Sequence, residues 1–380
     1  MARPMGAVRL RKGNAICLVL GTGLIIFILV FLFGSPSAVT TIPIAGASIH
    51  HLSPPTFPYL KKPSGAKSTK PPPVVRYNLN DVTVTSDPMG NRESILILTP
   101  LARFYPEYWE NLLKLTYPHD LITIGFIIPK NKEGNQATAE LQKAITKTQK
   151  QDPVQDRFKS IIILRQDFDP VILSQNEAVR HKLENQKARR ASMARARNSL
   201  LFTTLGPTTS WVLWMDADIV ETPPTLIQDL AAHDKPILTP NCFQRFTNDK
   251  GQPDERGYDY NNWQDSETAQ KLGDTLGADD ILLEGYAELP TYRTLMVYMT
   301  AESQDVQWEV PLDGVGGCAL MVKAQVHRDG AMFPPFVFYH LIETEGFAKM
   351  AKRLGWQSYG LPNYRVRSFE PSRGRSSGEC

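Results

Sequence analysis

The sequence predicts an α/β fold with a mostly parallel sheet, carried as one large domain behind an N-terminal apolar helix. From residue 93 onward, apolar runs typical of strands alternate with helical stretches. One of these runs, WVLWM, is continuously apolar, as expected of a central strand covered on both faces. With 380 residues and a net charge of +3, the chain is long enough for one such domain and too balanced in charge for a nucleic-acid binder.

The first element is an uncharged run of 19 residues from Ala15 to Phe33, AICLVLGTGLIIFILVFLF. As a helix it would be about 28 Å long, which matches a bilayer core. Arginine and lysine residues precede it and no charged residue follows before Lys61, so the positive-inside rule predicts a cytoplasmic N-terminus and a lumenal remainder. A cleaved signal peptide ending near Ala45 is the alternative, although the run is longer than a usual signal h-region.

Composition divides the rest of the chain. From Gly34 to Asp87 the sequence is rich in proline, serine, threonine and small residues, and we interpret it as an extended stem. The last residues, EPSRGRSSGEC, are polar and typical of disorder. The predicted organisation is a cytoplasmic tail (1–14), a transmembrane signal-anchor (15–33), a stem (34–87), a folded domain (88–368) and a disordered tail (369–380).

The elements of the domain are predicted from the period of the apolar residues and from proline positions. Pro223 and Pro224 open a helix, since proline is favoured at the first helical positions. Beyond Asn241 the pattern loosens into polar loops. In chain order we expect a strand at 94–99, a strand at 121–129, a helix at 135–151, a strand at 160–167, a helix at 174–204, the strand 211–215, a helix at 223–234, a strand at 236–240, a helix at 341–354 and a strand at 364–369.

Two aspartates, Asp216 and Asp218, directly follow the apolar strand. Residues two apart in an extended segment point to the same face, so both carboxylates should project from the carboxyl end of that strand, where open α/β sheets place ligands. Paired carboxylates repel each other unless a cation joins them, and oxygen ligands suit Mg²⁺ or Mn²⁺ bridging to phosphate. A metal-diphosphate site is therefore indicated; the alternative is that both side chains accept backbone N–H bonds in the turn.

A basic helical segment, QKARRASMARARNSL, lies just upstream. Its residues Arg190, Ala194, Arg197 and Leu201 share one helical face. Arginine forks bind diphosphate oxygens that a metal does not reach, so Arg190, Arg195 and Arg197 are candidate phosphate contacts, with a solvated basic face as the alternative. Together with the aspartates, this row suggests a nucleoside-diphosphate-sugar site in which metal and arginines stabilise the departing diphosphate.

Several longer motifs carry a family resemblance. SWVLWMDADIVETPPTLIQDL, RRASMARARNSLLFTTLGP, LLEGYAELPTYRTLM, PLDGVGGCALMVKAQVHRDGAMFPPF and FYHLIETEGFAKMAKRLGWQSYGLPNY closely resemble the fungal mannan polymerase glycosyltransferase family. The similarity covers residues 94–364, nearly the whole predicted lumenal part. Within the family, the chain looks most like the subunit shared by both Golgi mannan polymerase complexes.

The resemblance implies a single-pass type II Golgi membrane protein with a lumenal GT-A-like, Rossmann-type nucleotide-sugar-binding domain. It implies a metal-dependent, retaining α-1,6-mannosyltransferase that uses GDP-mannose and Mn²⁺ to extend the mannan on N-glycans of cell-wall mannoproteins. Related mannosyltransferase subunits are the implied partners. The alternative is a non-catalytic scaffold or allosteric subunit of the same complex. A metal-dependent nucleotidyl- or phosphotransferase is a third reading, but the sequence has no P-loop signature.

Carried over by motif, Asp216 and Asp218 correspond to the DxD motif of the family, with Asp218 as the nearer metal ligand. The strand end Thr99-Pro100-Leu101 matches the segment that lies against the nucleoside in GT-A folds.

Three further acidic residues are candidates at the reaction centre. Asp313, in the glycine-rich loop LDGVGG, is a candidate for sugar or acceptor contact, with a bulged strand as the alternative. Glu343 and Glu345 resemble an acidic motif beside the acceptor hydroxyl, although a helix N-terminus favours acidic residues in any case. A retaining double displacement would need a carboxylate on the opposite face of the sugar, and the sequence does not assign it.

The C-terminus departs from the family pattern. After LPNY the family continues with a histidine in a short strand, where a neutral imidazole can complete the metal shell, whereas here no histidine follows His340. A diverged terminus, or a gene model that runs past an exon boundary, would explain this, and we expect weaker Mn²⁺ and GDP binding. Cys242 and Cys318 could pair in an oxidising lumen, although no cysteine spacing indicates a disulfide framework or a zinc site.

Overall fold

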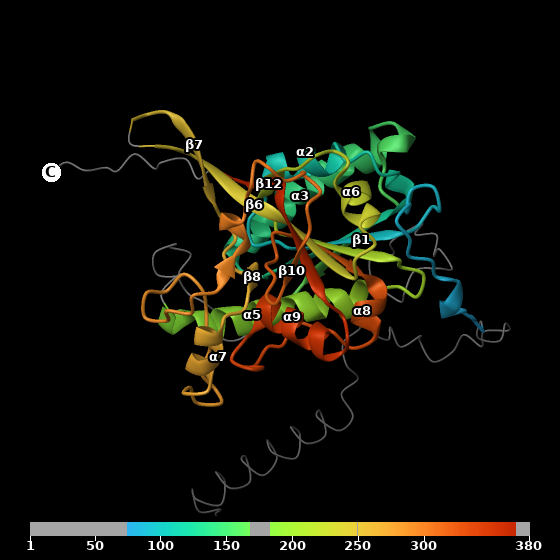
Figure 1. The fold of residues 1–380 in the computed structure, drawn as a ribbon. Helices are drawn as coiled ribbons and strands as arrows, with labels where there is room; N and C mark the ends of the chain where they lie inside the picture. Colours follow the sequence, from blue (N-terminus) through green and yellow to red (C-terminus); the bar gives the residue numbers. More distant parts are fainter. Residues whose placement is uncertain (1–73, 168–182, 249, 370–380) are drawn as a thin grey trace, which may run out of the picture. The chain divides into compact units, whose positions relative to one another are not determined.

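The computed structural model describes residues 74–167, 183–248 and 250–369 (Figure 1). The predicted signal-anchor (15–33), most of the stem, the start of the long helix (174–182) and the tail beyond residue 369 lie outside the described residues. Among the helices that are described, none combines the length and the apolar character needed to span a bilayer.

A ten-stranded mixed sheet runs through the folded part (Figure 1), and its main path has the order β10-β12-β6-β11-β4-β1-β2-β3. β5 pairs with β12, and β7 pairs with β6. The strands are β1 (Ile95–Pro100), β2 (Ile122–Ile128), β3 (Ser160–Arg165), β4 (Trp211–Met215), β5 (Ile219–Glu221), β6 (Ile237–Thr247), β7 (Pro253–Gly257), β10 (Val310–Leu312), β11 (Ala319–Lys323) and β12 (Ser358–Ser368). β8 (Trp263–Gln264) and β9 (Thr294–Leu295) form a separate two-stranded sheet.

One half of the sheet is parallel, as the sequence predicts. β1 pairs in parallel with both β2 and β4, and β2 pairs in parallel with β3. The strand order reverses at β1, because β2 and β3 lie on one side of it and β4 lies on the other. The loops that follow β1 and β4 therefore start at the same edge of the sheet and diverge, and such a switch point is where open α/β sheets bind ligands.

The other half is mixed, and there the prediction of a mostly parallel sheet is wrong. β11 runs antiparallel to both of its neighbours, β4 and β6, and β10 runs antiparallel to β12. A parallel neighbour needs a crossover connection, usually a helix. Between β6 and β11 the described residues form loops, four short strands, one 3₁₀ turn and the seven-residue helix α7 (Glu267–Gly273), and none of these is a crossover helix of that kind.

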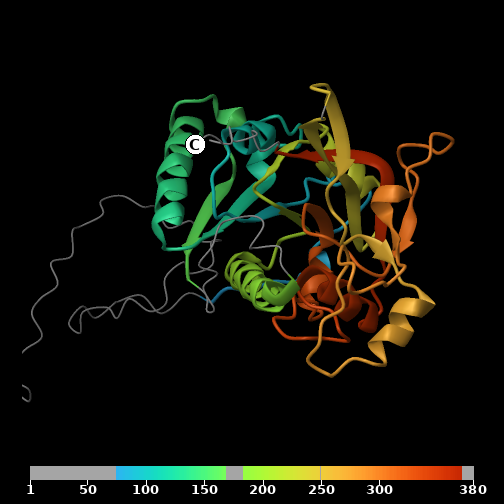
Figure 2. The same ribbon diagram turned by 90° about the vertical axis from the view of Figure 1, so that its left-hand side faces the viewer.

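Helices cover both faces of the sheet (Figures 1 and 2). On one face lie α2 (Pro106–Leu113), α3 (Lys132–Lys150) and α6 (Leu226–Ala232), and on the other lie α5 (Leu183–Thr204), α8 (Ala324–Arg328) and α9 (Glu343–Arg353). Short 3₁₀ turns are η1 (Leu79–Asp81), η2 (His119–Leu121), η3 (Val154–Asp156) and η4 (Met296–Tyr298).

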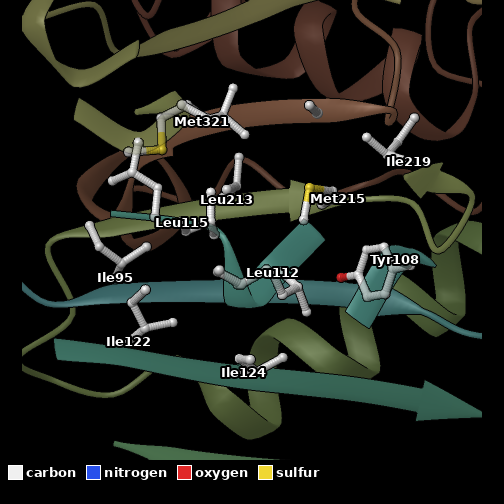
Figure 3. Close-up of a cluster of buried hydrophobic side chains, with 14 of the residues drawn as sticks. Ile95, Tyr108, Leu112, Leu115, Ile122, Ile124, Leu213, Met215, Ile219 and Met321 are labelled. Atoms are coloured by element: carbon white, nitrogen blue, oxygen red, sulfur yellow. The ribbon is translucent and has the colours of Figure 1, made fainter. Parts of the chain in front are cut away.

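The sheet has a hydrophobic core on each of its two faces, and successive side chains of the central strands point alternately into one core and the other. Ile95 and Ile97 of β1 pack against α2 and α3, in the cluster that Figure 3 shows, whereas Leu96 and Leu98 belong to the cluster beneath α5 and α9. This two-sided burial explains why β1 and β4 are continuously apolar. The α/β prediction is therefore confirmed for the part of the chain that the structure describes.

The strand predicted at 211–215 has the bounds of β4, and the helix predicted at 341–354 is α9 with slightly shorter ends. β6 and β12 are longer than predicted, because they pair with each other over most of their length. β7, β10 and β11 are not predicted, since they lie in the segment whose apolar pattern is loose.

Candidate functional site

A small pocket of about 110 Å³ lies at the carboxyl end of β4. Helix α5 contributes one wall, the start of α9 contributes another, and single residues of two loops complete it. The lining residues are Arg189, Arg190, Met193, Arg197, Asp216, Asn261, Gly317, Glu343 and Thr344. The structure therefore brings together one aspartate, two arginines and one glutamate that the sequence singles out.

Arg197 is the central residue of this pocket. Its Nη2 donates to Asp216 Oδ1 at 2.8 Å and its Nε donates to Glu343 Oε1 at 3.1 Å. Its guanidinium carbon lies 5.6 Å from the ring centroid of Trp214 and 5.5 Å from that of Phe333, which is cation-π distance. Arg197 thus joins the end of β4 to the start of α9 from a buried position, with 2% of its surface exposed.

The remaining Arg197 nitrogen, Nη1, is buried and has no hydrogen-bond partner within the described part of the chain. The same is true of Arg190 Nε. A buried donor without an acceptor costs about 1–3 kcal/mol, and more when it is charged. Two such donors beside one pocket indicate a place for the oxygens of an anionic ligand.

The three glycines of the loop LDGVGG are explained by close packing. A Cβ atom at Gly317 would collide with the guanidinium of Arg197, one at Gly316 would collide with the carboxylate of Asp259, and one at Gly314 would collide with the Trp263 ring. The loop therefore runs against the floor of the pocket, and only glycine leaves room for Arg197 at position 317.

Asp216 and Asp218 have different partners. Asp216 is partly exposed, with 33% of its side chain accessible, and contacts Arg197. Burial raises the pKa of Asp216 to about 6; Arg197 opposes this shift, and the charges of Asp218 and Glu343 add to it. Asp218 Oδ2 accepts a 2.7 Å hydrogen bond from the Tyr258 hydroxyl. Both of these partners come from other elements of the fold, Arg197 from α5 and Tyr258 from the loop after β7.

The two carboxylates fit part of a cation site. Carboxylates two positions apart at a strand end are oxygen donors of the kind that a hard divalent ion prefers, and such an ion retains positions for ligand oxygens. In the described residues no group of three or more histidine, cysteine, aspartate or glutamate side chains is placed to hold a metal. The third protein ligand implied by the family resemblance is therefore not found there.

β12, the C-terminal strand in which the family carries its histidine, does reach the aspartate turn. Ser368 pairs with Ile219, and the Phe369 N–H donates to the Asp218 carbonyl at 2.7 Å. The residues from Arg365 to Phe369 bring arginine, valine, serine and phenylalanine to this position, and none of these has an imidazole.

Glu343 and Glu345 take separate places. Glu343 lines the pocket and has φ = 58°, a left-handed backbone conformation that costs a glutamate about 1–3 kcal/mol and is concentrated at functional sites. Glu345 is fully buried, accepting from Arg190 Nη1 at 2.7 Å and from Trp263 Nε1 at 2.9 Å. Glu343 therefore borders the pocket, whereas Glu345 holds Arg190 in place from behind.

The predicted arginine row is placed as the helical period requires. Arg190 and Arg197 are buried on the face toward the sheet, whereas Arg195 is exposed and does not line the pocket. Residues two apart on a helix lie about 200° apart, so Arg195 and Arg197 cannot share a face. Arg189, which the sequence analysis does not single out, lines the pocket instead.

Thr99 and Leu101 are buried, and Thr99 Oγ1 forms a 2.6 Å hydrogen bond with the Tyr108 hydroxyl. Pro100 is the only partly exposed residue of the three. They end β1 beside β4, at the edge where the aspartates lie, so a ligand there would meet backbone and the Pro100 ring rather than the two buried side chains.

Asp313 does not line the pocket. Its Oδ2 accepts from the Asp265 N–H at 2.9 Å and its Oδ1 accepts from Lys352 Nζ at 2.5 Å. Burial opposes ionisation, but these two donors hold the pKa of Asp313 below its usual value. In this structure Asp313 thus joins the glycine-rich loop to α9.

Cys242 and Cys318 are both buried, free thiols, and burial raises the pKa of Cys242 while the neighbouring Cys318 thiol opposes this shift. The disulfide that the sequence allows is therefore not formed. The Cys318 carbonyl accepts the Asp216 N–H at 3.1 Å, so this thiol pair packs directly behind the aspartate turn.

Asn261 and Thr344 also line the pocket without being predicted. Asn261 accepts from Arg190 Nη2 at 2.9 Å. It stands in a polar loop with no periodic pattern, so no sequence signal indicates its place. Thr344, by contrast, lies between the two glutamates of the acidic motif.

The sheet has a switch point, and at its carboxyl edge two aspartates lie near buried arginines. These features define the class of this protein: an α/β protein with a charged pocket at the switch point of its sheet. The chain belongs to the Anp1 family, whose family model matches residues 73–337.

Named relatives place it further within that family. It is 56% identical over 294 residues to the Mannan polymerase complex subunit MNN9 of Candida albicans, covering 77% of this chain and 79% of the relative. It is 57% identical over 290 residues to the mnn9 subunit of Schizosaccharomyces pombe, covering 76% and 84%. Identity to the Mannan polymerase II complex ANP1 subunit of Saccharomyces cerevisiae is 34% over 323 residues, covering 83% and 63%. The predicted family is confirmed.

Among solved structures, one that resembles this chain is the mannosyltransferase PcManGT from Pyrobaculum calidifontis in complex with GDP-Man and Mn²⁺. Its TM-score is 0.38 at 12% identity, covering 77% of this chain and 61% of that one. A similarity this remote bears on neither substrate nor mechanism.

Proposed function

We propose that this protein is a mannosyltransferase subunit of a mannan polymerase complex, which transfers mannose from GDP-mannose to α-1,6-linked mannan on N-glycans of cell-wall mannoproteins. The names of its relatives support the complex and the polymer. The observation that carries the donor site is Arg197, buried between Asp216 and Glu343, with an Nη1 whose two N–H groups no described residue accepts.

In this proposal Asp216 and Asp218 hold Mn²⁺, which supplies Lewis-acid stabilisation of the charge on the departing diphosphate. Arg197 Nη1 and Arg190 Nε donate to diphosphate oxygens. The pocket volume of about 110 Å³ is below the range of roughly 300–1,000 Å³ usual for whole small-molecule ligands. We therefore assign the diphosphate-sugar part of the donor to the pocket, with the nucleoside toward the end of β1.

The reaction breaks the bond between mannose C1 and the diphosphate oxygen and forms a bond from C1 to the acceptor hydroxyl oxygen. GDP departs with the electron pair of the broken bond, and its diphosphate takes up the proton of the acceptor hydroxyl. Positive charge develops on the sugar as that bond breaks, and a nearby carboxylate stabilises it. We assign this role to Glu343 rather than Glu345. Glu343 lines the pocket and is bound by Arg197 at Oε1, whereas both carboxylate oxygens of Glu345 are bound, by Arg190 and Trp263.

We further propose a single-pass type II protein of the Golgi membrane, anchored by residues 15–33 and associated with related mannosyltransferase subunits. The uncharged run and the basic residues before it support this topology. Protease treatment of intact Golgi vesicles checks it: the domain should survive until detergent opens the vesicles. Digestion in sealed vesicles would place the domain in the cytoplasm and refute the topology.

A scaffold or allosteric subunit is the second candidate. Two observations favour it: no histidine follows His340, and the described residues contain no three-membered metal-ligand group. Such a subunit would bind GDP-mannose weakly and leave catalysis to its partners.

Calorimetric titration of the purified full chain with GDP-mannose, with and without Mn²⁺, tests the donor site. Mn²⁺-dependent binding that Asp216→Asn abolishes is expected, and Asp120→Asn, a change at an exposed ion pair, should leave it intact. Binding together with mannose transfer would identify the catalytic subunit, and binding without transfer would identify the scaffold. Absence of binding by folded protein would refute the donor site.

A further inference from the structure

A pair of exposed aromatic rings, one of them next in sequence to the pocket-lining Asn261, is not used by the proposed donor site. Tyr260 is 36% exposed and Tyr298 is 70% exposed. Their ring centroids are 6.2 Å apart with an interplanar angle of 58°. Burial raises the pKa of Tyr260, and the neighbouring Tyr298 hydroxyl adds to this shift. The two rings therefore lie close together while much of their surface remains open to solvent.

The position of Tyr260 is set by the residues on both sides of it. Asp259 is buried, and its Oδ1 accepts from both the backbone and the side-chain N–H of Asn261 at 3.0 Å. Asn261 lines the pocket and accepts from Arg190. Tyr260 thus stands one residue from a pocket wall, between two side chains that are themselves held.

Tyr298 is held near the segment that carries Tyr260 by backbone contacts of the residues just before it. The Met296 N–H donates to the Asn262 carbonyl at 2.8 Å, which continues the pairing of β8 with β9. Gly257 and Val297 are packed so closely that a Cβ at Gly257 would collide with the valine. The Tyr298 ring is consequently held opposite Tyr260 by the packing of these two backbone segments.

The chemistry of the pair suits a sugar ring. A pyranose has an apolar face of C–H groups and a rim of hydroxyls, and a tyrosine has an apolar ring face and a polar hydroxyl. The pair carries no charge, so it would not select the diphosphate, which the arginines of the pocket take. An uncharged chain of sugars that must end at the pocket matches both its composition and its place.

We propose that Tyr260 and Tyr298 form an acceptor subsite, on which a mannose unit of the growing mannan stacks while its reactive end enters the pocket. This inference rests on the proposed function. The subsite concerns the acceptor alone, so its residues should affect acceptor binding and leave donor binding unchanged.

The test measures calorimetric binding of a short α-1,6-linked mannose oligosaccharide and, in parallel, of GDP-mannose with Mn²⁺, to the full chain. Tyr260→Ala and Tyr298→Ala should each weaken oligosaccharide binding roughly five- to tenfold, the loss expected for one aromatic contact. Donor affinity should not change. Tyr298→Phe, which keeps the ring, should retain most of the oligosaccharide affinity. Tyr292→Ala is the matched control, because Tyr292 is 77% exposed and outside the pair.

Unchanged oligosaccharide affinity in both alanine variants would overturn the subsite, as would a wild-type chain that binds donor but no oligosaccharide. A change in self-association or partner binding with unaltered oligosaccharide affinity would assign the rings to a protein interface and likewise overturn it. Tyrosine-dependent oligosaccharide binding by a chain that binds no GDP-mannose would support the subsite while refuting the donor site.

Discussion

Arg197 shows how much one residue can determine in this protein. Its guanidinium joins Asp216 to Glu343 and lies near the rings of Trp214 and Phe333, and its buried Nη1 has no hydrogen-bond partner among the described residues. The helical spacing of the basic segment identifies Arg197 from sequence. Its neighbour two positions earlier, Arg195, looks equivalent in the motif and lies on the exposed side of α5.

Replacing Arg197 with lysine tests this assignment. Arg197→Lys keeps the charge but loses the forked geometry, so it cannot contact Asp216, Glu343 and a ligand oxygen together. One charge-assisted hydrogen bond is worth about 1.5–3 kcal/mol, so we expect affinity for GDP to fall by about ten- to a hundredfold. Arg195→Lys is the matched control and should stay within about twofold of wild type. Equal losses in both variants would contradict the assignment.

At the scale of elements, the site depends on three segments that meet: the end of β4, the middle of α5 and the start of α9. The loop before β11 passes beneath them, and its glycines give Arg197, Asp259 and Trp263 the space they occupy. The glycines can be recognised in the sequence. Their packing partners cannot be predicted from it, because Trp263 and Asp259 come from a polar loop more than fifty positions away.

Gly317→Ala should disturb the packing between the glycine-rich loop and Arg197. The added methyl would meet the Arg197 guanidinium, so the variant should lose about 1–3 kcal/mol of stability and bind GDP more weakly. Gly206→Ala is a fair comparison, since its nearest neighbour would lie at 3.6 Å, and it should change stability by less than about 0.5 kcal/mol. Urea unfolding and GDP titration measure both effects. A Gly317→Ala protein with wild-type stability and affinity would show that Arg197 has room to move.

At the scale of the whole molecule, a buried histidine outside the candidate site contributes to the free energy of unfolding. His327 Nε2 accepts from Trp214 Nε1 at 3.1 Å, and its Nδ1 donates to the Ala331 carbonyl at 2.8 Å. Burial lowers the pKa of His327 to about 4; the bond to Ala331 opposes the shift, and Arg328 adds to it. The neutral ring is therefore part of the core between β4 and α8.

This core histidine makes stability depend on pH. Because the folded pKa lies below the unfolded value of about 6.5, the unfolded chain binds the proton more tightly. The contribution of His327 is complete above pH 6.5 and declines as the pH falls toward 4. Between pH 7 and pH 5 we expect a loss of about 2 kcal/mol in the free energy of unfolding. Urea titrations at both pH values measure it.

His327→Gln should reduce that pH-dependent difference, although the variant is less stable at pH 7. His340→Gln, at a partly exposed position, should keep it. The same difference in His327→Gln as in wild type would show that other groups cause the acid sensitivity.

The sequence by itself determined the α/β class, the strand that ends in Asp216, the helical face that carries Arg190 and Arg197, and the family. These follow from local period, composition and motif, which a chain carries without folding. Three features became known only from the tertiary structure. β11 pairs antiparallel with β4 and β6, Glu343 lines the pocket while Glu345 is buried behind it, and Asn261 lines the pocket. Those depend on which distant segments pack together, and packing is settled by the shape and burial of the whole domain rather than by the spacing of residues along the chain.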